Sequence, residues 1–159
     1  MRVNMLELPR YEADDIIGTV SRICAEQNVE CDIITGDKDD LQLIGPQVRV
    51  QLITTRMGQT TTTVMDEAAV FEKYGVRPRQ LIEVKSLMGD ASDNIPGVAG
   101  VGEKTALALI QDFGSLAGVY ENIDDARIKK GVREKLLRDK EQAGMSRTLA
   151  AIVCSAPVN

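Results

Sequence analysis

The 159-residue sequence contains no histidine and no tryptophan. Without histidine, the chain can form neither a Ser-His-Asp triad nor a Cys-His pair, and it cannot build a histidine-ligated zinc site. Only three Tyr and two Phe residues are present, so we do not expect an aromatic surface that stacks nucleic-acid bases. The composition therefore leaves carboxylates as the main groups available for catalysis or metal binding.

Cysteine and long apolar segments are also scarce. The three cysteines, Cys24, Cys31 and Cys154, are an odd number without C-x-x-C spacing, which favours reduced, mostly buried thiols. No run of about 18 apolar residues could cross a membrane, and the first residues lack the pattern of a signal peptide. We therefore expect a soluble, cytoplasmic protein with no membrane partner.

Strands and helices alternate in the first part of the chain. Short apolar or β-branched runs predict strands over residues 3–8 and 31–35, and apolar positions at helical spacing predict a helix over residues 11–27. Residues 48–55 and the threonine run at 60–63 indicate a hairpin. This order predicts an α/β fold with a partial parallel sheet.

The second part of the chain, residues 65–159, is predicted to be helical. Asp66, Pro78 and the Gly114-Ser115 pair are typical of helix starts. No low-complexity linker separates this part from residues 1–64, so we expect the two parts to pack as one unit. The predicted helices cover residues 66–75, 79–87, 103–112, 129–140 and 141–153, with a further helix beginning at 115.

Three acidic clusters open the first predicted helix, follow the second predicted strand and occupy a loop after residue 87. Each cluster alone could serve a helix dipole, a solvated turn or an Asx-rich loop. Ligand sites in α/β sheets, however, gather beyond the carboxyl ends of strands, and the three clusters together favour a functional site. The candidate residues are Glu12, Asp14, Asp15, Asp37, Asp39, Asp90 and Asp93.

Seven carboxylates at one place would repel one another unless cations neutralised them. Hard oxygen ligands select Mg²⁺ or Mn²⁺, and two such ions about 4 Å apart can activate water and stabilise the reacting oxygens of a phosphodiester. The formal net charge is −5, but outside these seven residues the acids are fewer than the 19 Lys and Arg residues. Net acidity therefore does not argue against a nucleic-acid partner.

The segment GVAGVGEKTA, residues 97–106, is the most specific local signal. Gly100 and Gly102 allow a tight turn at a helix start, whose N–H groups can bind a DNA phosphate without reading the bases. The pattern G-h-G-x-x-x-A-x-x-h-h, where h is apolar, is the helix–hairpin–helix signature. The alternative is a simple glycine turn, but Lys104 and the glycine spacing favour phosphate binding.

Four motifs occur in order: YEADD at 11–15, TGDKD at 35–39, LMGDASDNIPGV at 87–98 and GVGEKTA at 100–106. With them the sequence resembles the 5′-nuclease (flap endonuclease) family, most closely the 5′–3′ exonuclease domain of bacterial DNA polymerase I. The resemblance implies a PIN-like α/β core followed by a helix–three-turn–helix region. It also implies metal-dependent hydrolysis of DNA as a 5′–3′ exonuclease or 5′-flap endonuclease.

The resemblance implies roles for the acidic residues toward two ions, Mg²⁺ or Mn²⁺. Glu12, Asp14 and Asp15 would be ligands of the first site. Asp37 and Asp39 would lie between the two ions. Asp90 and Asp93 would be ligands of the second site. The middle pair, Asp37 and Asp39, would be the catalytic residues. Asp40 stands at a position that is usually apolar in the family, so its role is doubtful.

The resemblance also implies that the glycine loop grips a nicked or 5′-flap duplex beside the cut and holds a K⁺ ion. The implied DNA-binding residues are Gly97, Val98, Gly100, Gly102, Lys104 and Thr105. In the full-length protein a polymerase domain would follow. The basic run of the last third either touches the DNA backbone or forms a solvated helix face, which is the favoured interpretation. This run comprises Arg127, Lys129, Lys130, Arg133, Lys135, Arg138 and Lys140.

The family's N-terminal portion, with a first strand, further aspartates and a basic arch, has no counterpart in this sequence. We therefore expect the chain to be the larger C-terminal part of such a domain, with an exposed sheet edge that favours dimerisation or strand swapping. One alternative function is a duplex-binding module that has lost catalysis with the absent ligands. A third interpretation is an acidic structural domain whose clusters serve only as caps and turns.

Overall fold

The computed structural model describes residues 3–158 and divides into two compact units. The N-terminal unit comprises Met1–Ala69 together with Ile152–Asn159, and the helical unit comprises Val70–Ala151. The boundary expected from the sequence lay after residue 64, and the last eight residues were expected to belong to the helical part. That the two parts pack as one unit stays a prediction.

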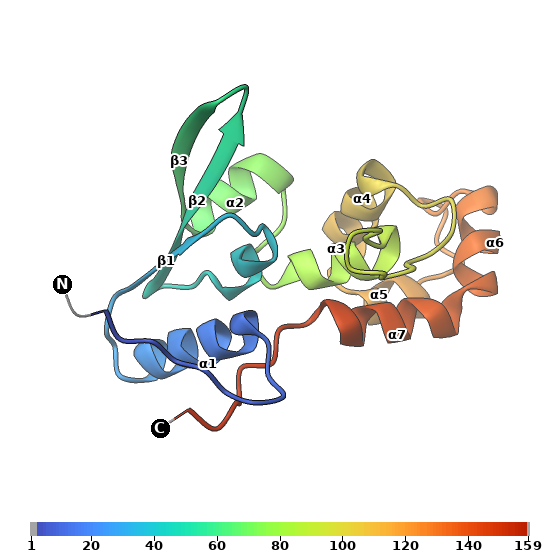
Figure 1. Ribbon diagram of the computed structural model, residues 1–159. Coiled ribbons are helices and arrows are strands. Elements are labelled where there is room, and N and C mark those ends of the chain that lie inside the picture. Colours follow the sequence, from blue (N-terminus) through green and yellow to red (C-terminus); the bar gives the residue numbers. More distant parts are fainter. Residues whose placement is uncertain (1–2, 159) are drawn as a thin grey trace. The chain divides into compact units, whose positions relative to one another are not determined.

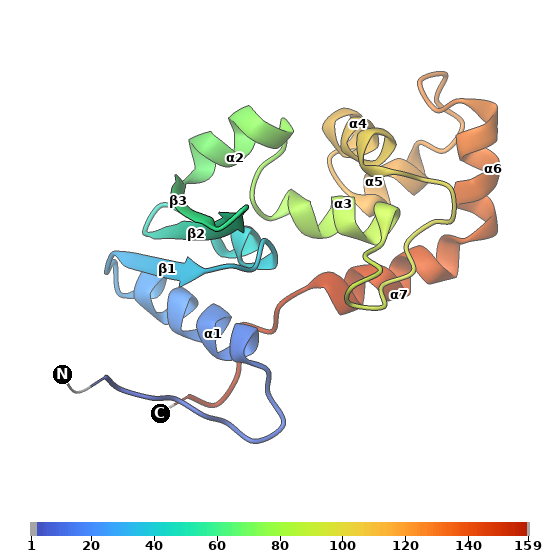
Figure 2. The ribbon, with the colours of Figure 1, turned by 45° about the horizontal axis from the view of Figure 1, so that its top comes forward.

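The N-terminal unit is a three-stranded sheet covered by a helix (Figures 1 and 2). The strand order is β1-β2-β3, with β1 parallel to β2 and β2 antiparallel to β3, so the predicted parallel pair and hairpin are confirmed. Helix α1 packs along β1 and β2. The elements are α1 (Ala13–Glu26), β1 (Cys31–Thr35), the short 3₁₀ helix η1 (Asp39–Leu43), β2 (Val48–Arg56) and β3 (Gln59–Met65).

The strand predicted over residues 3–8 is wrong. This segment is irregular and mostly exposed; the side chain of Met5, for example, is 89% accessible. A strand needs a neighbour for its backbone hydrogen bonds, and among the described residues this segment pairs with none. The edge of β1 opposite β2 likewise has no strand partner in the described part of the chain.

The last residues of the chain pack on α1. The Ala156 N–H donates to the Thr19 hydroxyl at 2.9 Å, and Arg22 Nε donates to the Cys154 carbonyl at 2.7 Å. A Cβ atom at Gly18 would lie 2.8 Å from Cγ2 of Ile152. A larger residue at position 18 would therefore force the Ile152 side chain to shift, because the tail lies so close to the helix.

The three cysteines form no disulfide, as expected, but they are half-buried rather than buried. Two of them, Cys24 and Cys31, lie near one another where α1 meets β1, and burial followed by the neighbouring Cys24 raises the pKa of Cys31 to about 11. A raised pKa keeps this thiol protonated and poorly reactive at neutral pH.

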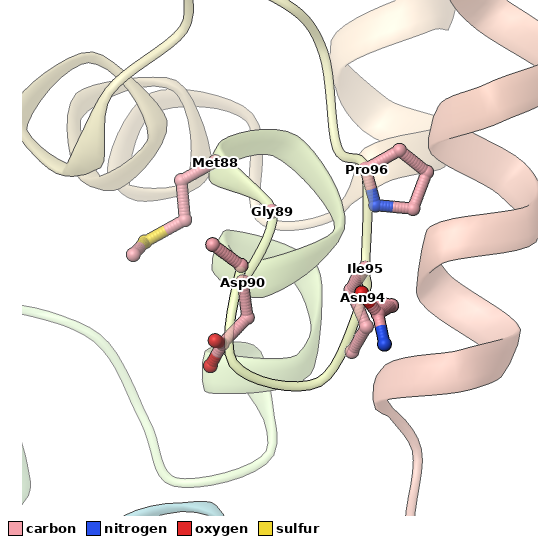
Figure 3. Close-up of a pocket in the computed structure, with 7 residues that line it drawn as sticks. Met88, Gly89, Asp90, Asn94, Ile95 and Pro96 are labelled. Atoms are coloured by element: carbon pink, nitrogen blue, oxygen red, sulfur yellow. The ribbon is translucent and has the colours of Figure 1, made fainter.

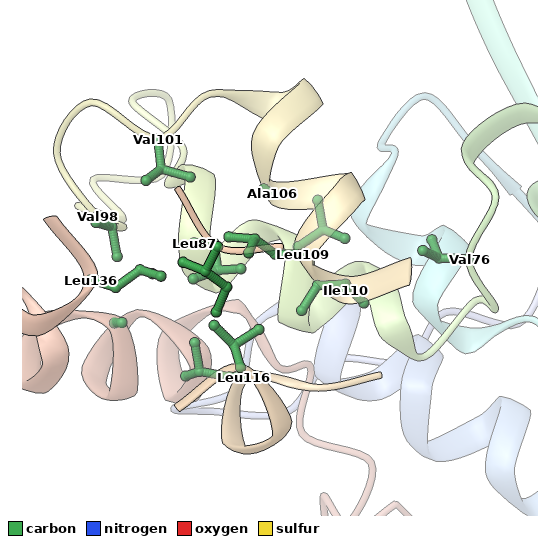
Figure 4. Packing of buried hydrophobic residues seen from close by; sticks show 13 residues of the cluster. Val76, Leu87, Val98, Val101, Ala106, Leu109, Ile110, Leu116 and Leu136 are labelled. Atoms are coloured by element: carbon green, nitrogen blue, oxygen red, sulfur yellow. The ribbon is translucent and has the colours of Figure 1, made fainter. Parts of the chain in front are cut away.

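The helical unit gathers its helices around one apolar core (Figure 4). Leu87, Ile110 and Leu136 are fully buried in this core. The predicted helices of this part are confirmed within a few residues at their ends. They are α2 (Glu67–Tyr74), which crosses the boundary between the units, α3 (Gln80–Met88), α4 (Glu103–Phe113), α5 (Leu116–Glu121), α6 (Lys130–Arg138) and α7 (Lys140–Ala150).

A buried ion pair ties three of these helices together. Glu83 of α3 is 8% exposed; it accepts a hydrogen bond from Arg147 of α7 at 2.8 Å and one from the Leu116 N–H, at the start of α5, at 3.0 Å. Both carboxylate oxygens are thus satisfied, as a buried charge requires. Within residues 3–158, no helix combines the length and apolar character needed to span a membrane.

Candidate metal centre and nucleic-acid interface

A hydrogen-bonded turn at the carboxyl end of β1 places two of the candidate acids. The Thr35 hydroxyl accepts a hydrogen bond from the Asp37 N–H at 3.0 Å, and Asp37 Oδ1 accepts one from the Asp39 N–H at 2.8 Å. These side-chain caps turn the chain from the strand into η1. The turn therefore presents the carboxylates of Asp37 and Asp39 beyond the end of the strand.

The start of α1 brings a further acid to the same place. Burial raises the pKa of Asp14 to about 6, and repulsion from Asp40, Asp37, Asp39 and Glu12 adds to the effect. Because Coulomb repulsion weakens with distance, the acids that repel Asp14 lie near it. The structure thus gathers these acids of the N-terminal unit, as the sequence predicted for four of the five.

Asp15, another predicted ligand, has a different environment. Its Oδ2 accepts a hydrogen bond from the Glu12 N–H at 3.2 Å, and its Oδ1 accepts one from the Val153 N–H at 3.1 Å. Asp15 therefore caps α1 and holds the C-terminal tail. Its role as a metal ligand stays a prediction.

Asp40 is the unexpected member of this group. Its side chain is completely buried, and neither carboxylate oxygen has a hydrogen-bond partner among the described residues. Burial raises the pKa of Asp40, the nearby Thr35 hydroxyl lowers it, and repulsion from Asp37 and Asp39 raises it further. The Thr35 hydroxyl does not form a hydrogen bond of normal geometry with this carboxylate. A buried carboxylate without partners is costly, so this group is suited to a cation.

The acids of the helical unit are paired with a lysine. Lys85 Nζ lies 3.0 Å from Asp90 Oδ2 and 2.8 Å from Asp93 Oδ2. Hydrogen bonds from Ser92, followed by the bond from Lys85, lower the pKa of Asp90 to about 2. Little in the sequence indicated Lys85, whose only signal was a lysine in the largely apolar segment VKSLM, residues 84–88, at the end of a predicted helix. The structure confirms that Asp90 and Asp93 lie close together.

A pocket of about 490 Å³ opens beside Asp90 (Figure 3). Its walls come from the end of α3 and the loop that follows, with Met88, Asn94 and Pro96 among its lining residues. Two backbone hydrogen bonds between Asp90 and Ile95, both 2.8 Å long, close this loop. Asp90 is therefore held on a short, rigid turn at the mouth of the pocket.

The glycine loop leads into α4 as predicted. Gly97 has φ +61°, and a Cβ atom there would lie 2.3 Å from the Gly89 nitrogen, so only glycine fits. Gly102 is the N-cap of α4, and Lys104 lies exposed in its first turn. The first N–H groups of a helix have no partner inside it and can bind an anion.

The remaining predicted DNA contacts differ in exposure. Val98 is 1% exposed and packs in the core of the helical unit, so only its backbone could reach DNA. Thr105 is half-buried, whereas Gly100 and Gly102 are exposed. The loop can therefore contact a phosphate mainly through glycine backbone and Lys104.

The donor set fits a divalent cation. Every candidate ligand offers carboxylate oxygen, which Mg²⁺ and Mn²⁺ prefer over softer ligands. The orphaned oxygens of Asp40 and the raised pKa of Asp14 indicate that these two acids have little compensating charge nearby. A bound cation would supply that charge.

Comparison with known proteins agrees with this picture. Residues 1–75 match the model described as 5′-3′ exonuclease, N-terminal resolvase-like domain, and residues 76–159 match 5′-3′ exonuclease, C-terminal SAM fold. DNA polymerase I of Lactococcus lactis is 46% identical over 154 residues, and that of Bacillus subtilis is 45% identical over 157 residues. The matches cover 96% and 99% of this chain but only 17% and 18% of those proteins.

Among solved structures, a T5 flap endonuclease in a complex with DNA and metal ions has a TM-score of 0.76 and 24% identity, covering 93% of this chain and 52% of that chain. This likeness confirms the expected fold, an α/β part followed by a helical part. Because the family models together match the chain from end to end, and the second alone covers more than half of it, the chain belongs to the 5′-3′ exonuclease family.

Proposed function

We propose that this chain is part of a metal-dependent 5′–3′ exonuclease or 5′-flap endonuclease that hydrolyses DNA phosphodiester bonds, within a longer protein related to DNA polymerase I. The observation that carries the proposal is the group of acids in the N-terminal unit. Burial, with added repulsion from the neighbouring acids, raises the pKa of Asp14 to about 6, and Asp40 has no hydrogen-bond partner among the described residues. The T5 flap endonuclease, which has this fold, forms a complex with DNA and metal ions.

In this proposal the acids hold divalent cations, Mg²⁺ or Mn²⁺. Such ions lower the pKa of bound water and stabilise charge on the oxygens of a phosphodiester. Asp37 and Asp39 are the catalytic ligands, held beyond β1 by the turn that begins at Thr35. Asp14 and Glu12 contribute from α1, while Asp15 keeps the start of that helix in place.

The helical unit would supply the second set of ligands and the grip on DNA. Lys85 orients the carboxylates of Asp90 and Asp93. The first turn of α4 would hold a DNA phosphate through its N–H groups and Lys104, which recognises the backbone and not the bases. The substrate is therefore a nicked or 5′-flap duplex of any sequence.

A K⁺ ion at the glycine loop is a further part of the proposal. Carbonyl oxygens are suitable ligands for such a hard cation, but those of Gly97, Ala99 and Gly100 already accept hydrogen bonds from side chains. The ion would therefore use a remaining carbonyl of the loop, such as that of Val101, because the Val98 carbonyl accepts a hydrogen bond from the Val101 N–H at 3.0 Å.

The test is cleavage of a 5′-labelled flap duplex by the 159-residue chain, with Mg²⁺ and with a chelator. Cutting in Mg²⁺ that the chelator abolishes is the expected result. Absence of cutting by a folded chain that still binds the duplex would contradict the proposal for this chain.

That second outcome would favour a duplex-binding module without catalysis. One observation supports this candidate: Lys85 forms ion pairs with both Asp90 and Asp93, so the chain itself compensates part of their charge. The module predicts that Lys104→Glu weakens duplex binding, because the substitution reverses a charge at the phosphate position. Equal binding by Lys104→Glu and the parent would exclude the phosphate grip in either candidate.

A further inference from the structure

The glycine loop of residues 97–102 has no regular secondary structure, so its shape depends on what packs behind it. Gly97 and Gly100 have φ values of +61° and +82°, which permit many alternative loop conformations. A phosphate site made of backbone N–H groups works only when those groups are held in place before the ligand arrives. Some other part of the helical unit must therefore fix the loop.

Two charged side chains of α6 reach the loop carbonyls. Lys135 Nζ donates to the Gly100 carbonyl at 3.1 Å, and Arg138 donates to the Ala99 carbonyl at 3.0 Å. These residues belong to the basic run that the sequence analysis interpreted as a solvated face. Their donors are directed at the protein's own backbone, and not only at solvent.

The junction between α6 and α7 completes the contact. Asp139 accepts a hydrogen bond from the Ala99 N–H at 3.0 Å and pairs with Arg138 at 2.8 Å. Along α7, Gln142 donates to the Gly97 carbonyl at 2.8 Å, and the Ser146 hydroxyl accepts from the Gly97 N–H at 2.9 Å. Figure 2 shows the loop running beside these two helices.

Together these bonds engage both backbone groups of Gly97 and Ala99 and the carbonyl of Gly100. The side of the loop that faces α6 and α7 is thereby saturated with partners. Gly102 and the first turn of α4, where Lys104 is exposed, are left to contact a ligand. The loop is therefore bonded to α6 and α7 on one side and exposed at Gly102 and Lys104.

We propose that Lys135, Arg138 and Asp139 are positioning residues for DNA binding: they brace the glycine loop against α6 and α7 and do not themselves contact phosphate. The proposal rests on the DNA-binding part of the proposed function. It assigns the basic residues two different roles, because Lys104 would touch the ligand whereas Lys135 and Arg138 hold the loop that carries it.

The sharpest test removes an acid. Loss of negative charge near DNA ordinarily strengthens binding, but Asp139→Ala also removes the acceptor of the Ala99 N–H and the partner of Arg138. We therefore expect Asp139→Ala to weaken binding of a nicked duplex about tenfold, measured by fluorescence anisotropy without divalent metal. Glu134→Ala, an exposed acid on the same helix, is the matched control and should leave affinity unchanged or slightly higher.

A second pair of variants keeps the test valid if Asp139→Ala fails to fold. Lys135→Met should weaken duplex binding, and Lys135→Arg, which retains a donor, should restore it. Affinity is measured over a series of salt concentrations, because loss of a phosphate contact lowers the slope of log K against log salt by about 1. For a positioning residue the slope stays unchanged while affinity falls.

Amide hydrogen exchange gives an independent readout without DNA. The Ala99 N–H should exchange faster in the Asp139→Ala or Lys135→Met variant, while amides of α4 in the core, such as that of Ile110, keep the parent rate. Unchanged affinity and exchange in both variants, or a salt slope reduced by about 1 in Lys135→Met, would overturn the brace and leave the proposed function standing. If the parent itself fails to bind the duplex, the proposed DNA grip fails and the brace with it, whatever the cleavage assay shows.

Discussion

The aspartates of the two units show opposite electrostatics. In the N-terminal unit, burial and four neighbouring acids raise the pKa of Asp14 to about 6. In the helical unit, Ser92 and Lys85 lower the pKa of Asp90 to about 2. The same side chain is thus favoured as an acid in one unit and as a carboxylate in the other.

The difference lies in where the compensating positive charge comes from. Lys85 is built into α3 and satisfies Asp90 and Asp93 within the chain. Asp40 has no hydrogen-bond partner among the described residues, and in the proposed function a cation from solution would compensate its charge.

The largest expected effect comes from removing charge in the N-terminal unit without disturbing its turn. Asp37→Asn keeps Oδ1 as acceptor for the Asp39 N–H but loses the negative charge of a proposed metal ligand. We expect Mg²⁺-dependent flap cleavage to fall more than about 100-fold, since loss of even an outer-shell partner costs 10- to 100-fold. Asp32→Asn, an exposed acid paired with Arg49 at 3.2 Å, is the control and should cut normally. Full activity in Asp37→Asn would remove this residue from the site.

Lys85→Met removes the positive charge that pairs with Asp90 and Asp93 in the helical unit. Without Lys85, Asp90 and Asp93 repel each other, and we expect the free energy of unfolding in chelator to fall by about 1–2 kcal/mol. This loss is smaller than for a fully buried ion pair, because the Asp93 side chain is half exposed. Urea unfolding measures this loss. Added Mg²⁺ should then stabilise Lys85→Met more than the parent. Lys73→Met, which removes an exposed lysine of α2, should change neither quantity.

The pH dependence of stability separates the two units. Asp14 has its pKa raised from 3.8 to about 6, so the unfolded chain releases this proton first as pH rises. Stability in chelator should fall by about 2 kcal/mol between pH 4 and pH 7, and Mg²⁺ should reduce that loss. Asp14→Asn should flatten the profile.

Asp90 predicts the opposite slope at lower pH. Its pKa is lowered from 3.8 to about 2, so its contribution is present above about pH 4 and is lost as pH falls toward 2. Urea unfolding of the parent and of Lys85→Met over this range checks the assignment. A profile that stays the same without Lys85 would show that Ser92 alone sets this pKa.

The smallest effect is expected from Asp40→Leu. Replacing a buried, unpartnered carboxylate by an apolar side chain should raise the free energy of unfolding in chelator by about 1 kcal/mol, as measured by urea unfolding. Stabilisation by Mg²⁺ should be weaker than in the parent, because one negative charge no longer needs compensation. A destabilised Asp40→Leu would mean that the carboxylate has a partner in solution.

Much of this site could be predicted from local sequence. Asp37 follows a β-branched strand, and Thr35 and Asp37 form their turn with bonds only two residues apart, so the pattern of neighbouring residues is sufficient. The Gly97–Gly102 loop is similarly local, because glycine is required where φ is positive. The strand predicted over residues 3–8 failed because pairing needs a partner strand that local sequence cannot supply.

Three features were beyond prediction because they join residues far apart in the chain. The Val153 N–H reaches Asp15 across 138 positions, and Lys135 reaches Gly100 across 35. The burial of Asp40 depends on elements that pack around η1 from elsewhere in the N-terminal unit. No periodicity or spacing encodes such contacts.

By itself, the sequence determined which groups this protein offers: a chain without histidine, with three clusters of carboxylates and a glycine turn before a helix, presents oxygen ligands and the backbone N–H groups of a helix start. Only the tertiary structure decided how those groups are compensated. Lys85 beside Asp90, Asp40 without a partner and Lys135 behind the loop all result from packing, because electrostatic energy depends on distance and burial, and neither is a property of local sequence.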